Sequence, residues 1–221
     1  MWTIRDGILW AGLCVWPIGR RYLVKRTTHM ETRACIKAQL MDEADLDRTL
    51  ERMARQIIER AALDAGSPER LALVGMQTRG VYLARRLQAK IRTAAGLEVP
   101  VGILDVTMYR DDVRLRAHQP VVRPTHIPFD VTGRHLVLID DVIYTGRTAR
   151  AALDALMDLG RPAAVYLLVM IDRGLRELPI CPDIVGRQVP TLPGEEVRVR
   201  LREVDHQEGV WLVETPRVPA P

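Results

Sequence analysis

From residue 42 onward, short apolar runs alternate with segments whose apolar residues recur every three or four positions. The runs are typical of buried strands, and the segments between them are typical of amphipathic helices. The four strand candidates are LALVGM (71–76), VGILDVTMY (101–109), HLVLIDDV (135–142) and AAVYLLVMI (163–171). This alternation predicts an α/β fold with a mainly parallel sheet covered on both faces. In such folds ligands bind beyond the carboxyl ends of the strands.

Residues that favour helix termini mark the limits of the helical segments. Asp42 is a suitable N-cap for the first helix, with Asp45 at the third helical position. Glycine follows each of the three helical segments, at Gly66, Gly96 and Gly160, as is common at helix C-termini. We therefore expect three helices between the strands, the second over 81–95 and the third over 149–159.

The segment EVRVRLR (196–202) has a different periodicity. Valine or leucine alternates with arginine along it, which is typical of a strand with one buried and one exposed face. We expect this strand to belong to a small subdomain beside the parallel sheet.

Residues 110–125 form a polar, charged connection that two prolines interrupt. Long connections in compact enzymes often act as lids, but they can also be disordered surface loops. Both interpretations stay open for this segment.

The composition fits one globular domain. The 221 residues are 48% hydrophobic, which is enough for a full core. The cysteines, Cys14, Cys35 and Cys181, form no CxxC pair, so we expect a reducing, cytoplasmic environment. The five histidines lack HxxxH or HExxH spacing, and we predict no metal site built from protein side chains. The net charge of +4 fits an anionic ligand and equally an arginine-rich surface.

The N-terminal region is unlike the rest, because residues 8–18 (ILWAGLCVWPI) are its most apolar stretch. This stretch is too short to span a bilayer, and its basic residues follow it, unlike those of a secretory signal. Met30 lies just before the first recognisable element. We interpret residues 1–33 as an extension, with 1–29 arising from an upstream start assignment, 34–215 as the main domain and 216–221 as a tail.

The segment VLIDDVIYTGRTA (137–149) carries the clearest chemistry. Asp140 and Asp141 close an apolar strand and can accept hydrogen bonds from the vicinal hydroxyls of a ribose. The turn that follows opens a helix, so that backbone N–H groups and the hydroxyls of Thr145 and Thr148 can converge on a phosphate. GxxxxGK[ST] and GxGxxG are absent, which disfavours ordinary NTPase or dinucleotide chemistry. Aspartates that cap a helix and a glycine that makes a turn are the structural alternative, but their combination favours a phosphorylated sugar.

The same segment resembles the signature with which type I phosphoribosyltransferases bind 5-phosphoribosyl-1-pyrophosphate (PRPP). Further segments resemble, in order, the PyrR family of pyrimidine operon regulators and uracil phosphoribosyltransferases: LVGMQTRGVYLARRL (73–87), VPVGILDVTMYRDD (99–112), IPFDVTG (127–133), RTARAALDALMDLGRPA (147–163) and DRGLRELPI (172–180). The resemblance covers about residues 34–213. It implies a phosphoribosyltransferase domain over 34–215, with a mainly parallel sheet flanked by helices and a small hood subdomain.

The resemblance implies that uracil and PRPP give UMP and pyrophosphate, with Mg²⁺ bound mainly through PRPP or pyrophosphate. Asp140 and Asp141 would hold the ribose diol and offset the positive charge that develops as pyrophosphate leaves. Thr78 and Arg79 would form the pyrophosphate loop, and Arg110 would close over the leaving group. The expected PRPP and UMP contacts within the signature are Asp140, Asp141, Val142, Ile143, Tyr144, Thr145, Gly146, Arg147 and Thr148.

The base site implied by the resemblance lies under the hood. Arg173 and the strand around Val197 would lie near uracil, with Val197 contributing through its backbone. The resemblance also implies a homodimer or higher homo-oligomer that binds UMP or UTP. We expect no association with a membrane, because the apolar stretch 8–18 is too short to span one.

Members of the family also bind RNA, typically a stem-loop in the leader mRNA of pyrimidine genes. Arg52, Arg55 and Arg176 are the candidate RNA contacts. The sequence departs from RNA-binding members at Glu51, Arg55, Leu175 and Cys181. Glu51 adds negative charge where phosphate is expected, whereas Arg55 adds a donor. We expect regulation by transcription attenuation, and two alternatives stay open: a phosphoribosyltransferase that has lost RNA regulation, and one that acts on another base such as hypoxanthine.

Overall fold

The computed structural model describes residues 35–64, 68–109 and 124–214. These residues belong to one unit of the chain, which spans Arg33–Pro221. The interpretations of residues 1–33 and 216–221, most of the connection 110–125, and the role of Arg110 concern parts of the chain outside the described residues.

A five-stranded parallel sheet forms the centre of the described unit. Its order is β3-β2-β4-β5-β6, and each neighbouring pair is parallel. The strands are β2 (Leu71–Met76), β3 (Val101–Leu104), β4 (His135–Ile143), β5 (Ala164–Asp172) and β6 (Ile184–Gln188). The chain moves from β2 to β3 in one direction and then returns to place β4 on the other side of β2. This reversal creates a switch point between β2 and β4, where the loops diverge and leave room for a ligand.

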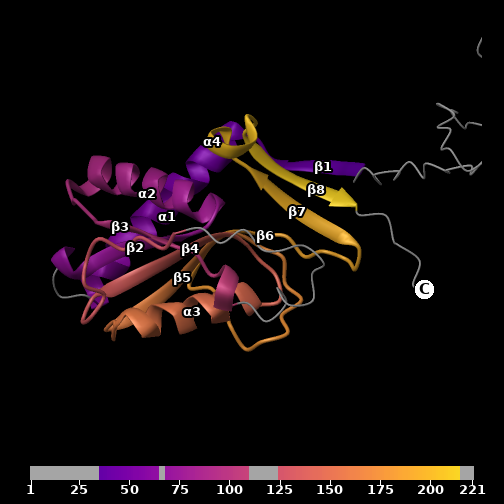
Figure 1. Cartoon of the computed structure of the whole chain (residues 1–221). Helices are drawn as coiled ribbons and strands as arrows, with labels where there is room; N and C mark the ends of the chain where they lie inside the picture. Colours follow the sequence, from indigo (N-terminus) through magenta and orange to yellow (C-terminus); the bar gives the residue numbers. More distant parts are fainter. Residues whose placement is uncertain (1–34, 65–67, 110–123, 215–221) are drawn as a thin grey trace, which may run out of the picture. The chain divides into compact units, whose positions relative to one another are not determined.

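Helices cover both faces of this sheet, as the alternating sequence predicts. In Figure 1, α1 (Glu43–Asp64) and α2 (Arg79–Ala95) lie above the sheet and α3 (Arg147–Leu159) lies below it. Leucine, isoleucine and methionine side chains of α1 and α2 are buried in one core cluster, and four alanines and Leu156 of α3 are buried in a second. No helix in the part of the chain that the structure describes is long and apolar enough to cross a bilayer.

The predicted helix limits agree closely with the structure where they can be compared. The Asp42 carboxylate accepts a hydrogen bond from the Asp45 backbone N–H at 2.7 Å, and the Asp45 carboxylate accepts one from the Asp42 backbone N–H at 3.3 Å. This reciprocal pair caps α1. Gly96 ends α2 with φ of 66° and donates its N–H to the Arg92 carbonyl at 2.9 Å. The second and third helices begin two residues earlier than expected, at Arg79 and Arg147.

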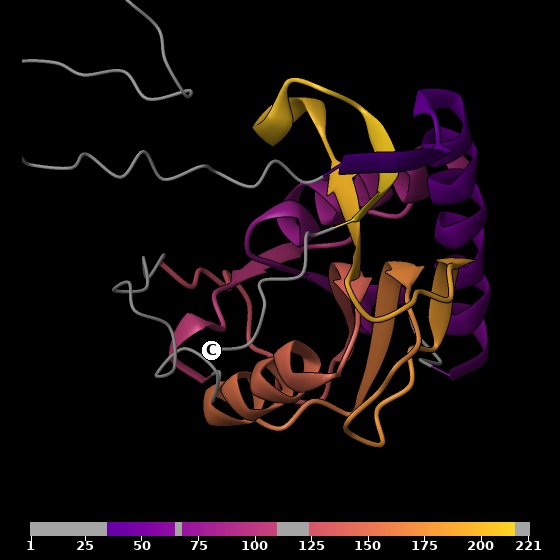
Figure 2. The ribbon, with the colours of Figure 1, turned by 90° about the vertical axis from the view of Figure 1, so that its right-hand side faces the viewer.

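A three-stranded antiparallel sheet forms the hood. Its order is β1-β8-β7, from β1 (Cys35–Met41), β8 (Gly209–Glu214) and β7 (Glu195–Arg200), with the short helix α4 (Arg202–Asp205) between β7 and β8. The predicted strand 196–202 is therefore confirmed as β7, although it ends two residues earlier because Arg202 begins α4. Figure 2 shows the arrowheads of β4, β5 and β6 pointing toward the hood, so the hood lies beyond the carboxyl ends of the parallel strands.

The predicted strand 101–109 is too long. β3 ends at Leu104, and a 3₁₀ turn follows at Thr107–Tyr109. The Asp105 carboxylate accepts hydrogen bonds from the backbone N–H and the hydroxyl of Thr107 at 2.9 and 2.5 Å. Such local side-chain bonding competes with strand pairing and ends the strand.

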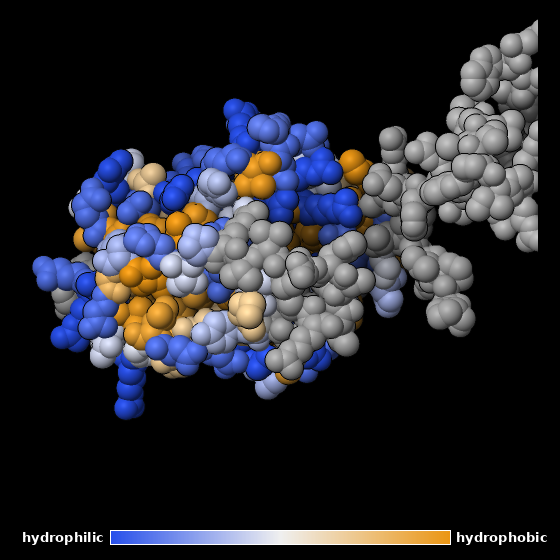
Figure 3. All heavy atoms as spheres, in the orientation of Figure 1, coloured by the Kyte–Doolittle hydropathy of each residue, from blue (hydrophilic) through white to orange (hydrophobic). Residues whose placement is uncertain are grey.

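Beside this edge of the sheet, hydrophobic residues reach the surface between α2 and α3 (Figure 3).

Candidate active site

The two carboxylates of the predicted signature lie near the end of β4, the central strand of the sheet. β4 pairs with β2 on one side and β5 on the other, so its backbone is firmly held. The Asp140 carboxylate accepts a hydrogen bond from the Asp141 backbone N–H at 2.9 Å, and the Asp141 carboxylate accepts one from the Val142 backbone N–H at 3.0 Å. Each side chain is thus oriented by the backbone that follows it.

A pocket of about 330 Å³ lies where β4 turns into α3. Its wall includes the signature residues Asp140, Val142, Ile143, Tyr144, Thr145, Gly146, Arg147 and Thr148. Because α3 begins at this turn, its first backbone N–H groups are available to an anion in the pocket. The structure therefore brings most of the predicted phosphate contacts together around one cavity.

Gly146 gives the turn its shape. Its φ of 93° lies in the left-handed region that favours glycine. The loop after β5 packs against the same turn, because the backbone N–H groups of Glu177 and Leu178 donate to the Thr145 carbonyl at 3.0 and 3.2 Å. The Glu177 carboxylate also pairs with Arg147 at 2.8 Å. These contacts hold the turn from the side of the loop after β5.

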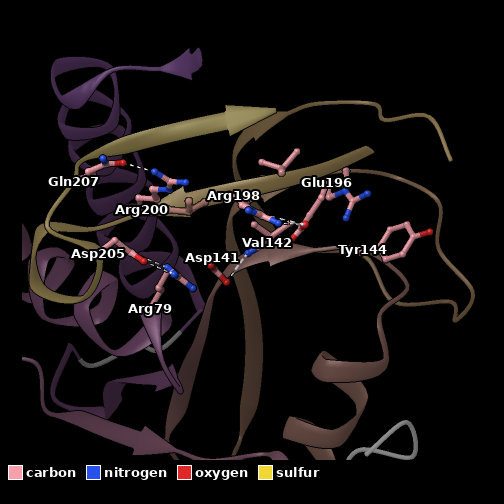
Figure 4. Close-up of a pocket in the computed structure, with 12 residues that line it drawn as sticks. Arg79, Asp141, Val142, Tyr144, Glu196, Arg198, Arg200, Asp205 and Gln207 are labelled. Atoms are coloured by element: carbon pink, nitrogen blue, oxygen red, sulfur yellow. Dashed lines mark hydrogen bonds and ion pairs between the residues drawn. The ribbon is translucent and has the colours of Figure 1, made fainter. Parts of the chain in front are cut away.

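A second pocket, of about 680 Å³, lies on the other side of the β4 end, below the hood (Figure 4). It is lined by Arg79, Asp141, Val142, Tyr144, Arg173, Glu196, Val197, Arg198, Val199, Arg200, Asp205 and Gln207. Val142 and Tyr144 line both pockets. The two cavities are therefore neighbours that share one wall.

Asp141 is the carboxylate of β4 that lines the larger pocket. Burial raises the pKa of the Asp141 carboxyl, while hydrogen bonding with Asp140 and the positive charge of Arg79 oppose that increase. The hydrogen bond with Asp140 and the charge of Arg79 therefore both favour the ionised form of Asp141.

Arg79 reaches this pocket because α2 begins close against β4. A Cβ added at Gly80 would lie 2.4 Å from the Ile139 carbonyl oxygen, so only glycine permits this approach. Thr78 is the N-cap residue of α2 and does not line either pocket. Its peptide bond with Gln77 is cis.

The Arg79 guanidinium forms a bidentate pair with Asp205 of α4. Its Nε and Nη2 groups donate to the Asp205 carboxylate at 3.0 and 2.6 Å (Figure 4). Hydrogen bonding to Asp205 raises the pKa of Arg79. Burial alone would raise the pKa of Asp205, but the hydrogen bonds from Arg79 and the Leu201 backbone lower it overall. Both groups are therefore charged near neutral pH.

Arg173 and Val197, the predicted base contacts, line the larger pocket together. Arg173 is 8% exposed, and burial lowers its pKa. Its guanidinium lies 4.3 Å from the centre of the Tyr144 ring and donates to the Thr191 hydroxyl at 3.3 Å and to the Glu195 carbonyl. Arg173 thus ties the end of β5 to the start of the hood.

Two of the three candidate RNA contacts have structural partners. Arg52 of α1 donates to the carbonyls of Val185 and Gly186 in the edge strand β6. Arg176 donates to the Tyr144 carbonyl at 2.8 Å and pairs with Asp172 at 2.7 Å. Its guanidinium therefore supports the loop after β5.

Arg55 is an exposed residue of α1. Glu51, the acidic departure from the family pattern on the same helix, lies 3.6 Å from the Lys90 ammonium of α2. Part of its negative charge is thereby offset.

Six residues of the larger pocket were not predicted as site residues from the sequence: Glu196, Arg198, Arg200, Val199, Asp205 and Gln207. The alternation in 196–202 predicts that the first three share one face of β7, but not that this face borders a cavity. Nothing in the local sequence marks Asp205, whose partner Arg79 is 126 residues away.

Among the described residues there is no group of three or more His, Cys, Asp or Glu side chains placed to bind a metal ion. Asp140 and Asp141 are the carboxylates that border the shared wall of the two pockets. A cation at this place would need oxygen ligands from a bound molecule as well as from the protein.

Comparison with known proteins agrees with this geometry. Residues 39–202 match the model of the phosphoribosyl transferase domain. A curated relative from Pelotomaculum thermopropionicum, named Bifunctional protein PyrR, is 57% identical over 81% of this chain and 97% of its own length. A protein of the same name from Thermus thermophilus is 54% identical over 80% of this chain and 96% of its own.

Solved structures show the same fold at low sequence identity. Hypoxanthine phosphoribosyltransferase from Trypanosoma cruzi aligns with a TM-score of 0.62 and 15% identity, covering 82% of this chain and 98% of that chain. The enzyme from Staphylococcus aureus aligns with a TM-score of 0.60 and 16% identity, covering 82% and 94%. The expected phosphoribosyltransferase fold is therefore confirmed. The chain belongs to the phosphoribosyltransferase family and, within it, to the PyrR family.

Proposed function

We propose that the protein transfers ribose 5-phosphate from PRPP to uracil, which gives UMP and pyrophosphate. The observation that carries this proposal is the division of the signature between two adjoining pockets. Asp140 lines the pocket at the start of α3, Asp141 lines the pocket below the hood, and Val142 and Tyr144 line both. A ribose across this shared wall would present its 5-phosphate to α3 and its anomeric carbon to the larger pocket.

Binding of the 5-phosphate is assigned to the turn before α3. Backbone N–H groups at a helix N-terminus bind phosphate without a lysine. The hydroxyls of Thr145 and Thr148 add donors on the same cavity wall. This turn would fix the ribose in position before any bond changes.

The chemical step depends mainly on charge. The bond between the anomeric carbon and pyrophosphate breaks, its electron pair leaves with pyrophosphate, and the ribose ring becomes positive. The Asp140 and Asp141 carboxylates would accept hydrogen bonds from the ribose hydroxyls and stabilise that charge. Uracil N1 then bonds to the anomeric carbon, and its proton is released to solvent or pyrophosphate.

The leaving group would bind at the start of α2, where Thr78 and Arg79 form the pyrophosphate loop. Arg110, which lies outside the described residues, would close over it. Mg²⁺ would be held mainly by oxygens of PRPP or pyrophosphate and by water, near the Asp140 and Asp141 carboxylates. When bound, Mg²⁺ neutralises charge on the pyrophosphate oxygens.

The base would lie in the larger pocket beside Arg173 and the backbone of Val197. This location is supported by the position of both residues on the pocket wall, beyond the carboxyl end of the parallel sheet. The choice of uracil is supported by the identity with proteins named PyrR. A base other than uracil is the first alternative.

Regulation is the second part of the proposal. The relatives carry the name Bifunctional protein PyrR, and we infer that the protein binds the leader mRNA of pyrimidine genes with an affinity that UMP and UTP adjust. Arg55 is exposed on α1, whereas the guanidinium groups of Arg52 and Arg176 donate to backbone carbonyls of β6 and of Tyr144. A cytoplasmic homodimer or higher oligomer remains part of the proposal, and a purely catalytic protein is its alternative.

A pyrophosphate-release assay across bases tests the enzymatic proposal. With Mg²⁺ and PRPP, uracil should release pyrophosphate and form UMP, and hypoxanthine should release far less. Release with hypoxanthine but not uracil would favour the alternative base. No release with any pyrimidine or purine would contradict the enzymatic proposal.

A further inference from the structure

We propose that Asp205 is a positioning residue for Arg79, which it holds in the orientation that receives the pyrophosphate group of PRPP. This inference rests on the proposed function, in which Arg79 belongs to the pyrophosphate loop. It assigns a role in substrate binding to the hood helix α4, which carries none of the residues anticipated from the sequence.

The geometry of the pair leaves part of the guanidinium for a ligand. Asp205 receives hydrogen bonds from Nε and Nη2 of Arg79, at 3.0 and 2.6 Å, so it occupies one edge of the planar group. A guanidinium has five N–H donors, and the two on Nη1 point away from that edge. Arg79 and Asp205 both line the larger pocket with Asp141. The remaining edge of Arg79 can therefore meet an anion while the pair with Asp205 is intact.

The Asp205 carboxylate is held independently of Arg79. One of its oxygens accepts the Leu201 backbone N–H at 3.0 Å, and the Asp205 backbone N–H donates to the Leu201 carbonyl at 2.7 Å. Its side chain is 18% exposed, compared with 32% for Arg79. The acceptor is therefore the more fixed member of the pair.

A second arginine of α2, on the same face of α2 as Arg79, also holds α4 in place. Arg86 lies two helical turns after Arg79 and pairs with Glu203 at 2.7 Å and with Glu208 at 2.5 Å. Arg202 of α4 pairs in turn with Glu43 of α1 at 2.5 Å. The hood helix is thus attached to both α1 and α2, and Asp205 has little freedom to move with Arg79.

Fixing Arg79 in advance matters because arginine has one of the largest side-chain entropies. An arginine that is ordered only when the ligand binds loses part of the interaction energy to that ordering. The opposite role is also conceivable, in which Asp205 competes with pyrophosphate for Arg79. The open edge of the Arg79 guanidinium favours the positioning role. The two roles predict opposite changes in pyrophosphate affinity when the Asp205 charge is removed.

The test compares Asp205→Asn with Asp205→Glu and Asp47→Asn. Asp47 is the matched control, because it pairs with Lys90 of α2 at 2.7 Å and neither residue lines the larger pocket. Two measurements are made on each full-length protein: KM and kcat with varied PRPP and varied uracil, and calorimetric binding of inorganic pyrophosphate with MgCl₂. Thermal unfolding confirms that each variant is folded.

We expect Asp205→Asn to raise KM for PRPP and Kd for pyrophosphate by about tenfold, with KM for uracil changed by less than about twofold. Asp205→Glu should recover part of the loss, and Asp47→Asn should match the unchanged protein. Equal or tighter pyrophosphate binding by Asp205→Asn would overturn the positioning role, as would an unchanged protein that binds no pyrophosphate. If Asp205→Asn binds pyrophosphate more weakly but neither the unsubstituted protein nor any variant forms UMP, the role of Asp205 is supported. The same result would contradict the proposed enzymatic activity.

Discussion

Asp140 and Asp141 are consecutive residues, yet their side chains line different pockets. The reason is the alternation of side chains along β4. Leu136, Leu138 and Asp140 lie on the face of the sheet that packs against α3. Ile139 and Asp141 lie on the opposite face, which packs against α1 and α2. One strand thereby places a carboxylate on each side of the position proposed for the ribose.

Asp141→Asn tests the electrostatic role of this arrangement. The substitution keeps the shape of the side chain but removes the charge that would stabilise the positive ribose. We expect kcat for UMP formation to fall by about a hundredfold or more, by analogy with other charge-stabilising groups. Steady-state kinetics with saturating PRPP measures this effect. A change of less than about threefold would mean that Asp141 does not stabilise the reacting ring.

The same substitution should stabilise the folded protein at neutral pH. Burial raises the pKa of Asp141 above its ordinary value of 3.8, so the folded state binds the proton more tightly than the unfolded state. Its contribution is therefore favourable at low pH and is lost as pH rises through the raised pKa. Asparagine cannot ionise and avoids that loss. Urea unfolding should show a higher free energy of unfolding for Asp141→Asn than for the unsubstituted protein at neutral pH, and a smaller difference near pH 4. An equal difference at both pH values, or a larger one near pH 4, would contradict this account.

Gly80→Ala tests the close approach that brings Arg79 to the site. The added methyl group would lie 2.4 Å from the Ile139 carbonyl oxygen, so α2 or β4 must shift. We expect a loss of about 1–3 kcal/mol of stability together with a large loss of activity. Gly96→Ala is the control, because Gly96 has a φ of 66° but open space around it. It should cost about 1–2 kcal/mol and leave turnover unchanged. If Gly80→Ala were fully active, the approach would not be needed for the site.

Arg55→Gln tests the RNA part of the proposal. Loss of one phosphate contact should weaken binding to the leader transcript and reduce the slope of log K against log salt by about 1. Turnover of uracil should not change, because Arg55 is on the surface of α1 and lines neither pocket. Filter binding at several salt concentrations measures the slope. Equal affinity for an unrelated hairpin of the same length would count against specific regulation.

Arg52→Gln is a less selective probe, because Arg52 donates to carbonyls of β6 and its loss should also lower stability. A variant that lowers both RNA affinity and the unfolding temperature would not separate the two effects. The comparison with Arg55→Gln makes this separation possible.

The sequence alone predicts those parts of the fold that local patterns specify. The apolar run 71–76 coincides with β2, and Asp42 caps α1 as expected. As predicted, the signature at 137–149 spans the end of an apolar strand and the start of a helix. Apolar runs, helix periodicity and capping are properties of neighbouring residues, so they can be recognised without knowledge of the fold.

The hood was only partly predicted, for a physical reason. β1 is mostly exposed and lacks a clear alternation, and it becomes a strand by pairing with β8 at the opposite end of the chain. The Arg79 and Asp205 pair likewise joins residues 126 positions apart. Such contacts depend on how distant elements meet, and no periodicity in either segment encodes them.

The most direct test of the account is a calorimetric titration of PRPP with Mg²⁺ into the unchanged protein and into Asp140→Asn/Asp141→Asn. The account predicts one PRPP per chain for the unchanged protein, and binding at least about a hundredfold weaker when both carboxylates are neutral. Equal binding by the two proteins would contradict the role given to the β4 carboxylates. An unchanged protein that takes up no PRPP would contradict the proposed function as a whole.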